Sequence, residues 1–357
     1  MISTALSKRL GLKVPIFQAP MAGVTTPELV LAVGKAGALG GFGFAFTEPE
    51  ALKAAVEKVR AAADVPIHIN LFVERQAPEP TPEQLRAATA AIAPAFEALG
   101  VPIPQKLKPP FCPGLSAQIE MVLSLRPTVL SFHFNPFAPE VIRDAKKLNI
   151  LVGGSATTPE EAQQIEALGA DFIIAQGAEA GGHRGTFFSS YEAGMIGSLA
   201  LIRVIVKRCR LPVVAAGGIM DGAGLAAVLA LGAQAAQMGT AFLACPESGA
   251  PVQHKRALLN LRENGTVITR AFTGRPARGI RNRFIEHAER NPGPILQFPA
   301  QLKLTAGLRT ESNRQGTAEY VALWAGQGYP LATDESVATL ISRWASEARE
   351  ILANLNK

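Results

Sequence analysis

The chain contains few of the residues that mark several classes of protein. Its 357 residues include three cysteines, Cys112, Cys209 and Cys245, which are too sparse and too far apart for a disulfide scaffold or a paired metal site. A reduced, cytoplasmic setting is therefore expected. No Ser/His/Asp order and no metal-ligand spacing stands out, so we expect neither hydrolysis nor a bound metal.

Charge of one sign and long apolar runs are also scarce. Charged residues make up 18% of the chain, and 35 basic against 29 acidic residues leave a net charge of +6. Because acidic residues are interspersed throughout, we expect attraction for small anions and no nucleic-acid partner. The uncharged stretch 222–246 is broken by glycines, and Lys8, Arg9 and Lys13 interrupt the N-terminal apolar residues. Neither a membrane span nor a signal-peptide core is predicted.

The dominant pattern is a short apolar segment followed by a helix-length segment, repeated eight times. Most of the apolar segments do not alternate with polar residues, which is typical of strands covered on both faces. Helix starts are indicated by Thr26-Pro27, Asn135-Pro136, Thr158-Pro159 and Asp221. The expected strands are 15–19, 38–43, 67–71, 128–133, 150–154, 171–176, 212–216 and 235–239.

Eight β/α units in about 240 residues predict an α/β fold, a TIM (β/α)8 barrel with an added smaller lobe. The rival is a doubly wound open sheet, because residues 222–227 read G-x-G-x-x-A, but no acidic residue follows before Glu247. The expected division is a barrel over 1–245 with an insertion at 74–114, a substrate-side lobe over 246–310, and helices over 311–357 that pack back on the barrel.

The candidate site residues follow the strands, because TIM barrels carry their active sites at the C-terminal strand ends. Asn70 and Gln176 offer both donors and acceptors, as a heterocyclic ligand requires. The glycine pair Gly217 and Gly218 and the segment 237–240 each precede a helical stretch. Backbone N–H groups freed in such turns predict a phosphate site after strands seven and eight.

The loop 176–185, QGAEAGGHRG, carries the most informative pattern in the sequence. Adjacent glycines let the backbone approach a ligand closely, and a histidine beside them is placed for proton transfer or for holding an anion. His183 is therefore the leading catalytic candidate. His133 fits a substrate contact and a pocket-wall histidine equally well. His254 and His287 receive no role.

The ordered motifs 18–23, 151–155, 176–185 and 215–222 with 237–240 resemble those of the nitronate monooxygenases, and 274–278 and 324–327 are similar to later segments of that family. The resemblance implies a noncovalent FMN at the top of the barrel. It also implies oxidation of alkyl nitronates, such as propionate 3-nitronate, by O2 to a carbonyl compound and nitrite. The expected partners are thus a small anionic nitronate and O2, with a homodimer as a further option.

By this resemblance, Met21 would lie near the flavin ring and Gly218 would help to hold the phosphate. His183 would stabilise the anion and act as a base only toward neutral nitroalkanes, with His133 as a second pocket contact. The cofactor-binding set that the resemblance implies is Ala19, Pro20, Met21, Asn70, Gln176, Gly181, Gly217, Gly218, Gln237, Met238, Gly239, Thr240 and Gln327.

The sequence departs from the family pattern at the substrate pocket. Some members carry tyrosines and a lysine there, whereas residues 108–111 and 299–309 of this chain contain no tyrosine. Lys303 or Arg309 is expected to supply the positive charge. Two other functions stay open on the same barrel: an NAD(P)H-dependent flavin reductase of quinones or enoyl thioesters, and a noncatalytic barrel that binds a phosphate-bearing ligand.

Overall fold

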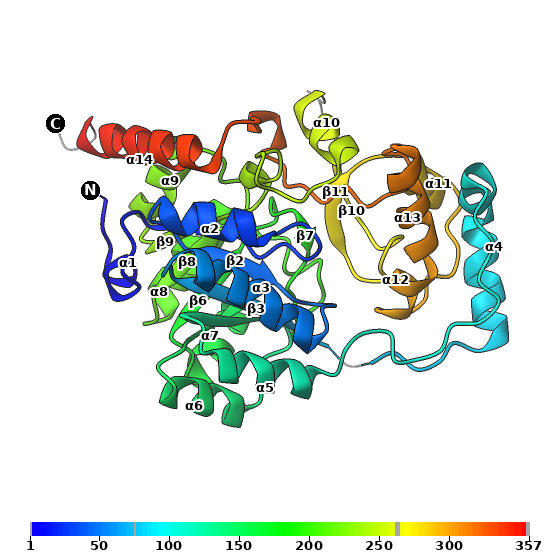
Figure 1. Ribbon diagram of the computed structural model, residues 1–357, viewed down its shortest axis with the longest axis horizontal. Helices are drawn as coiled ribbons and strands as arrows, with labels where there is room; N and C mark the ends of the chain where they lie inside the picture. Colours follow the sequence, from blue (N-terminus) through cyan, green and yellow to red (C-terminus); the bar gives the residue numbers. More distant parts are fainter. Residues whose placement is uncertain (1, 75, 261–264, 355–357) are drawn as a thin grey trace.

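Eight parallel strands form one sheet in the order β1-β9-β8-β6-β5-β4-β3-β2 (Figure 1). The computed structural model describes residues 2–74, 76–260 and 265–354, so the ends of the predicted ranges at 1 and 355–357 lie outside the described residues. The strands are β1 (Ile16–Gln18), β2 (Gly40–Gly43), β3 (Ile67–Val73), β4 (Val129–Phe134), β5 (Leu151–Ala156), β6 (Phe172–Gln176), β8 (Val213–Ala216) and β9 (Ala235–Met238).

The sheet closes on itself between β1 and β2. The N–H of Gln18 donates to the carbonyl of Leu39 at 2.8 Å, and the N–H of Leu39 donates to the carbonyl of Ile16 at 3.0 Å. This closure confirms the predicted TIM barrel, and the rival open sheet is wrong. Every predicted strand overlaps an observed one, because strands buried on both faces leave an uninterrupted apolar signature in the sequence.

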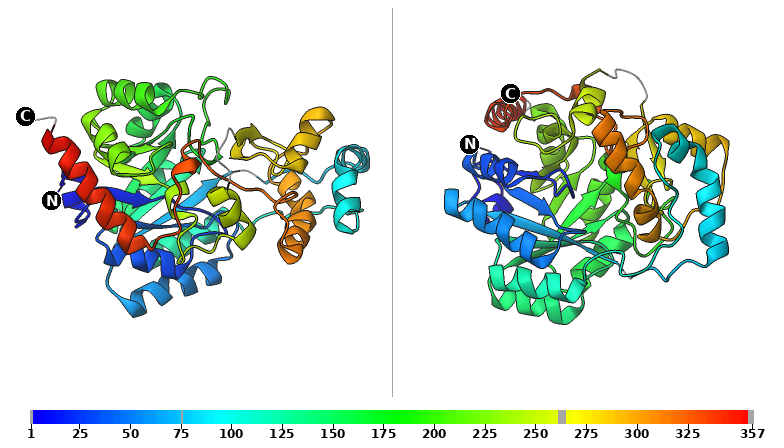
Figure 2. Two further views of the ribbon diagram at one scale, coloured as in Figure 1. Left: turned by 90° about the horizontal axis from the view of Figure 1, so that it is seen from above. Right: turned by 45° about the vertical axis from the view of Figure 1, so that its right-hand side comes forward.

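Helices on the outside of the barrel connect the strands (Figure 2). Side-chain caps at the predicted starts satisfy backbone donors: Thr26 accepts from the N–H of Leu29 at 3.0 Å, and Thr158 accepts from that of Glu161 at 3.2 Å. The helices of this layer are α2 (Pro27–Lys35), α3 (Pro49–Ala62), α5 (Leu115–Leu125), α6 (Pro139–Lys147), α7 (Pro159–Ala167), α8 (Ser198–Arg208) and α9 (Gly222–Ala230).

A second apolar core lies beside the barrel and is built from two distant parts of the chain. Residues 77–111 and 271–308 share it, with α4 packed on α11 and α13 at the far end of the molecule (Figure 1). The predicted insertion is thus part of the lobe, and α13 runs across the predicted boundary at 310. The lobe elements are α4 (Pro82–Leu99), β10 (Thr266–Thr269), β11 (Ala277–Ile280), α11 (Arg283–Arg290), α12 (Ala300–Leu304) and α13 (Ala306–Gln315).

A short strand, β7 (Gly182–His183), links the two parts, because it follows barrel strand β6 and pairs antiparallel with lobe strand β11. The remaining elements lie around the barrel and its mouth: α1 (Ala5–Arg9), η1 (Thr240–Phe242), α10 (Val252–Asn260), η2 (Tyr329–Leu331) and α14 (Val337–Asn354). No helix within the described ranges has both the length and the apolar character to cross a membrane.

Candidate active site

A cavity of about 610 Å³ opens at the C-terminal ends of the barrel strands, facing the lobe. Its volume is in the range of small-molecule and cofactor sites. The barrel brings these residues together from distant segments, because all eight strand ends meet at one mouth. The sequence candidates that line it are Ala19, Pro20, Met21, Asn70, His133, Gln176, Gly181, His183, Gly217, Gly218, Gln237, Gly239 and Thr240.

Met238 and Gln327 belong to the same expected set but do not line the cavity. The Met238 side chain is only 1% exposed and packs in the barrel core, since successive side chains of a strand point to opposite faces. The Gln327 side chain is exposed, and its backbone N–H donates to the carbonyl of Glu179 at 2.9 Å. The flanking glycines at 326 and 328 line the cavity in its place.

The turn after β8 has the character of an anion site. Gly217 and Gly218 have φ values of +113° and +75°, a backbone region that other residues rarely adopt. Among the described residues, the backbone N–H groups of Gly217, Gly218 and Gly239 find no protein acceptor. These donors stand at the two strand ends that hold phosphate in many TIM barrels. The geometry therefore fits the predicted phosphate position.

The N-terminus of α9 itself is already occupied by carboxylates. Asp221 accepts from the N–H of Gly224 at 2.8 Å, and Glu347 of α14 accepts from that of Gly222 at 3.0 Å. A Cβ on Gly222 would lie 2.4 Å from that of Glu347, so only glycine lets α14 approach this closely. An anion in the cavity would thus meet the loop N–H groups and not the end of α9.

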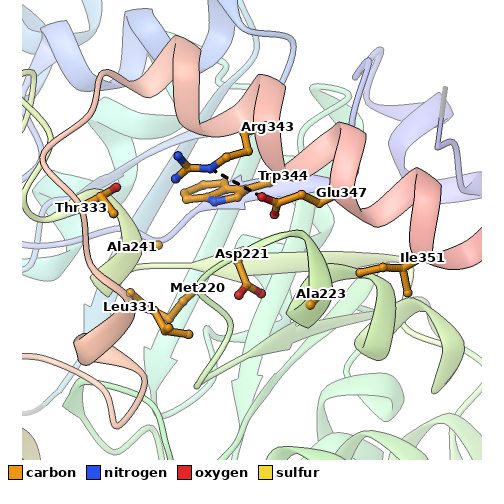
Figure 3. Close-up of a pocket in the computed structure, with 10 residues that line it drawn as sticks. All are labelled: Met220, Asp221, Ala223, Ala241, Leu331, Thr333, Arg343, Trp344, Glu347 and Ile351. Atoms are coloured by element: carbon orange, nitrogen blue, oxygen red, sulfur yellow. Dashed lines mark ion pairs between the residues drawn. The ribbon is translucent and has the colours of Figure 1, made fainter.

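The contacts of α14 with this turn surround a second, outer cavity of about 510 Å³ (Figure 3). Trp344, 2% exposed, meets the Phe242 ring edge-on at a centroid distance of 5.3 Å. Met220 lines both cavities, so it separates the outer one from the barrel mouth. Helix α14 therefore packs against the turn after β8 and against the turn after β9.

Replacing Glu347 with alanine is expected to lower the free energy of unfolding by about 1 kcal/mol, because the N–H of Gly222 loses its acceptor. Chemical denaturation would measure this change. Glu350→Ala is the matched control, since the exposed Glu350 on the same helix accepts from the Ser346 hydroxyl and does not cap α9. Equal effects of the two substitutions would contradict the bracing contact.

The histidine loop is held against the segment that follows the lobe. A Cβ on Gly181 would lie 2.6 Å from the backbone of both Ala325 and Gly326, so glycine is required for this approach. Arg184, in the same loop, is 1% exposed. The guanidinium of Arg184 donates to the carbonyls of Gly177 at 2.7 Å and Gly194 at 2.9 Å. The loop is thus a fixed part of the cavity wall.

Gln176 and His133 both bind the carbonyl of His183, at 2.9 and 3.1 Å. Gln176 also accepts from the N–H of Gly185 at 2.8 Å, and the second ring nitrogen of His133 contacts the hydroxyl of Ser155 at 2.9 Å. Burial lowers the pKa of His133 to about 4, so its ring is neutral at neutral pH. Both side chains therefore orient the loop, and His133 has no ring nitrogen left to take up a proton.

The His183 ring is enclosed by aromatic side chains. Those of Phe72, Phe298 and Trp324 lie with their centroids 5.8, 5.7 and 5.6 Å away. Burial, and next to it the nearby His133 and Arg275, lower the pKa of His183 to about 3. The imidazole is thus neutral at neutral pH.

Asn70 is oriented from below by two polar residues of the barrel interior. Its amide nitrogen donates to the Ser131 hydroxyl at 2.7 Å, and that hydroxyl also contacts the ring of His68 at 2.6 Å. The carbonyl oxygen of Asn70 and its second amide N–H are therefore left for a ligand. The amide oxygen of Gln237 is buried with no partner among the described residues, as expected where a ligand donor is missing.

Several lining residues carry no signal in the sequence, because they come from segments far from the motifs. Phe46 and Phe72 give the cavity part of its apolar wall, and the buried His254, to which the sequence assigned no role, lines it from α10. Arg309 of α13 also lines it, whereas Lys303 does not. Of the two expected cations, only Arg309 is therefore placed to meet a ligand.

In the described part of the chain, no group of three or more His, Cys, Asp or Glu side chains is arranged to hold a metal ion. The cysteines at 112, 209 and 245 are free thiols, and burial raises the pKa of Cys245 to about 12.

Comparison with known proteins agrees with this geometry. The family model described as nitronate monooxygenase matches residues 3–347. Nitronate monooxygenases of Pseudomonas aeruginosa and Paraburkholderia phytofirmans are each 41% identical, over 96% and 99% of this chain and 98% and 97% of their own. A solved nitroalkane oxidase from Streptomyces ansochromogenes superposes with a TM-score of 0.89 at 38% identity, covering 98% of this chain and 99% of its own. FabK from Thermotoga maritima reaches 0.78 at 26% identity, with 100% and 99% covered. Because the family model matches residues 3–347 and relatives align over nearly the full length, the chain belongs to the nitronate monooxygenase family.

Proposed function

We propose that the cavity binds FMN. Two features support this. The free backbone donors of the turns after β8 and β9 suit a phosphate, and the oxygens of Asn70 and Gln237 suit the N–H groups of a heterocycle. Met21 and Gly181 would lie beside the ring. Met238 and Gln327 stay in the proposed set through their backbones only.

The reaction proposed for this site is the oxidation of alkyl nitronates by O2 to a carbonyl compound and nitrite. The observation that carries it is the family match over residues 3–347. Bound FMN would supply the one-electron chemistry with O2. The chain's own residues would bind the anion, exclude water with the aromatic wall around His183, and take up a proton when the substrate is a neutral nitroalkane.

A direct test compares two activities of the protein after it has been loaded with FMN. Nitrite release from propionate 3-nitronate under air and NADH oxidation with a quinone acceptor are measured side by side. Fast nitrite release with slow NADH oxidation supports the proposal. The reverse result would favour the flavin reductase, for which the structural similarity to FabK is the supporting observation. Protein that takes up no FMN would point to a noncatalytic barrel.

Arg309 is proposed to bind a negatively charged group at the far end of the substrate. Among the described lining residues it is the one side chain with a full charge, and none of the ion pairs among the described residues involves it. Because a nitronate with a carboxylate carries two negative charges, a cation opposite the nitro end would hold the second one. The other arginine near the site, Arg275, already pairs with Glu74 and lies 3.8 Å above the Phe134 ring.

Arg309→Ala is expected to raise the KM for propionate 3-nitronate about tenfold and to leave that for ethylnitronate within about twofold, because only the first substrate has a carboxylate. Steady-state nitrite release measures both. Lys303→Ala is the matched control, being an exposed cation of the neighbouring helix outside the cavity. An equal rise for both substrates would refute the carboxylate contact.

A further inference from the structure

The hydrogen bonds of Thr273 determine which nitrogen of His183 carries the proton. The threonine is 2% exposed, and its hydroxyl lies 3.0 Å from Nε2 of His183. The same hydroxyl donates to the carbonyl of Arg275 at 3.2 Å and accepts from the N–H of Arg275 at 3.3 Å. A hydroxyl has one proton to give and two lone pairs.

This inventory admits one arrangement in which every contact is a hydrogen bond. With its proton given to the Arg275 carbonyl, Thr273 can only accept from His183, so Nε2 carries the imidazole proton. In the opposite arrangement Thr273 donates to Nε2, and the Arg275 carbonyl loses this donor. Losing a hydrogen bond beside the buried Thr273 side chain is unfavourable, which selects the first arrangement.

The other ring nitrogen, Nδ1, then has a lone pair. Nδ1 has no hydrogen-bond partner among the described residues, and it is not among their buried unpaired polar atoms. The His183 side chain lines the cavity. It is therefore the atom that a substrate can reach. The low pKa of the ring keeps this lone pair free of a proton at neutral pH.

From this geometry we infer that Thr273 is a positioning residue, which holds neutral His183 with Nε2–H bonded and with Nδ1 as the proton acceptor of the cavity. The inference rests on the proposed function, and it gives the Thr273 hydroxyl a role in one step, the removal of a proton from a neutral nitroalkane. In that step Nδ1 takes the α-proton of a neutral nitroalkane, the C–H electron pair passes into the nitro group, and a nitronate results. Thr273 continues to accept from Nε2–H in the imidazolium. A substrate supplied as the nitronate needs no such step.

The charged and titratable groups that face the ring are few. His133 lies behind the loop with both nitrogens bonded, and the guanidinium of Arg275 is directed to Glu74. Neither is placed to exchange a proton with Nδ1. The Thr273 hydroxyl is thus the contact on which the orientation of the proton depends.

The test uses FMN-saturated enzyme and two substrates, nitroethane and preformed ethylnitronate. Thr273→Val keeps the shape of the side chain and removes the hydroxyl, so kcat/KM for nitroethane should fall about tenfold while that for ethylnitronate stays within about twofold. Thr273→Ser should restore most of the loss. The ¹⁵N NMR spectrum of histidine-labelled enzyme, assigned with His183→Asn, should show protonated Nε2 in the wild type and a mixture of both tautomers in Thr273→Val.

Thr305→Val is the matched control, since this buried threonine of the same lobe donates to the carbonyl of Phe272 at 2.7 Å and does not touch His183. It should leave both substrates and the spectrum unchanged. Equal losses on the two substrates in Thr273→Val, or Nε2–H retained without the hydroxyl, would overturn the inference. If the wild-type enzyme releases nitrite from neither substrate, the proposed function is wrong. The ¹⁵N NMR spectrum would still decide whether Thr273 orients His183.

Discussion

Gly239→Asp is expected to yield a folded protein that does not retain FMN. The new carboxylate would lie at the turn where the free N–H groups converge, and its charge would repel the phosphate in a partly desolvated site. We expect the dissociation constant of FMN to rise at least about a hundredfold, which corresponds to roughly 3 kcal/mol of lost binding free energy. Flavin fluorescence titration of the apoprotein measures it.

The control for this substitution is Gly239→Ala. Its Cβ would lie 3.3 Å from that of Ala19, a tight contact that the alanine methyl group can relieve by a small shift. Alanine therefore adds nearly the same bulk at Cβ without the charge and should weaken FMN binding far less. Stoichiometric yellow flavin in purified Gly239→Asp would show that the phosphate lies elsewhere.

His183→Asn is expected to have the second large effect, on one class of substrate. The loss of the proton acceptor should lower kcat/KM for nitroethane about a hundredfold, within the usual contribution of a general base. The value for ethylnitronate should change less than about threefold, because a nitronate has already lost its proton. Nitrite release with the two substrates at one pH gives the ratio.

His287→Asn supplies the comparison, because this histidine of α11 bonds the carbonyl of Ala91 and lies outside the cavity. It should leave both rates unaltered. A loss of equal size on nitroethane and ethylnitronate in His183→Asn would remove the base from the mechanism and leave His183 as a packing residue of the aromatic wall.

The sequence predicts the barrel well because its strands are recognised from local patterns. Each strand is short, apolar and covered on both faces, and most of the helix starts carry a capping oxygen or a proline. One start signal misleads: α6 begins at Pro139, three residues after the predicted Asn135-Pro136. The Asn135 side chain donates instead to the carbonyl of Val73 at 3.0 Å, so it closes a turn between strands.

The lobe and the roles within the cavity depend on contacts that no local pattern encodes. No pattern within residues 82–99 predicts that this helix packs against residues 306–315, more than two hundred positions away. Gln176 and His133 are found by their position at strand ends, but their partner, the carbonyl of His183, is set by how the loop folds back. Arg309 of α13 lines the cavity and Lys303 of α12 does not, a difference set by how the two helices pack in the lobe.

The pairing of β7 with β11 means that the two halves of the proposed chemistry are carried by different parts of the molecule. The barrel turns carry the N–H groups proposed to bind the phosphate of the cofactor, whereas the strand that bears His183 is hydrogen-bonded to the lobe. Any tilt of the lobe would therefore move the proton acceptor over a stationary ring. Exchanging whole lobes among relatives should thus change the rate of proton removal from neutral nitroalkanes and leave the affinity for the cofactor unchanged.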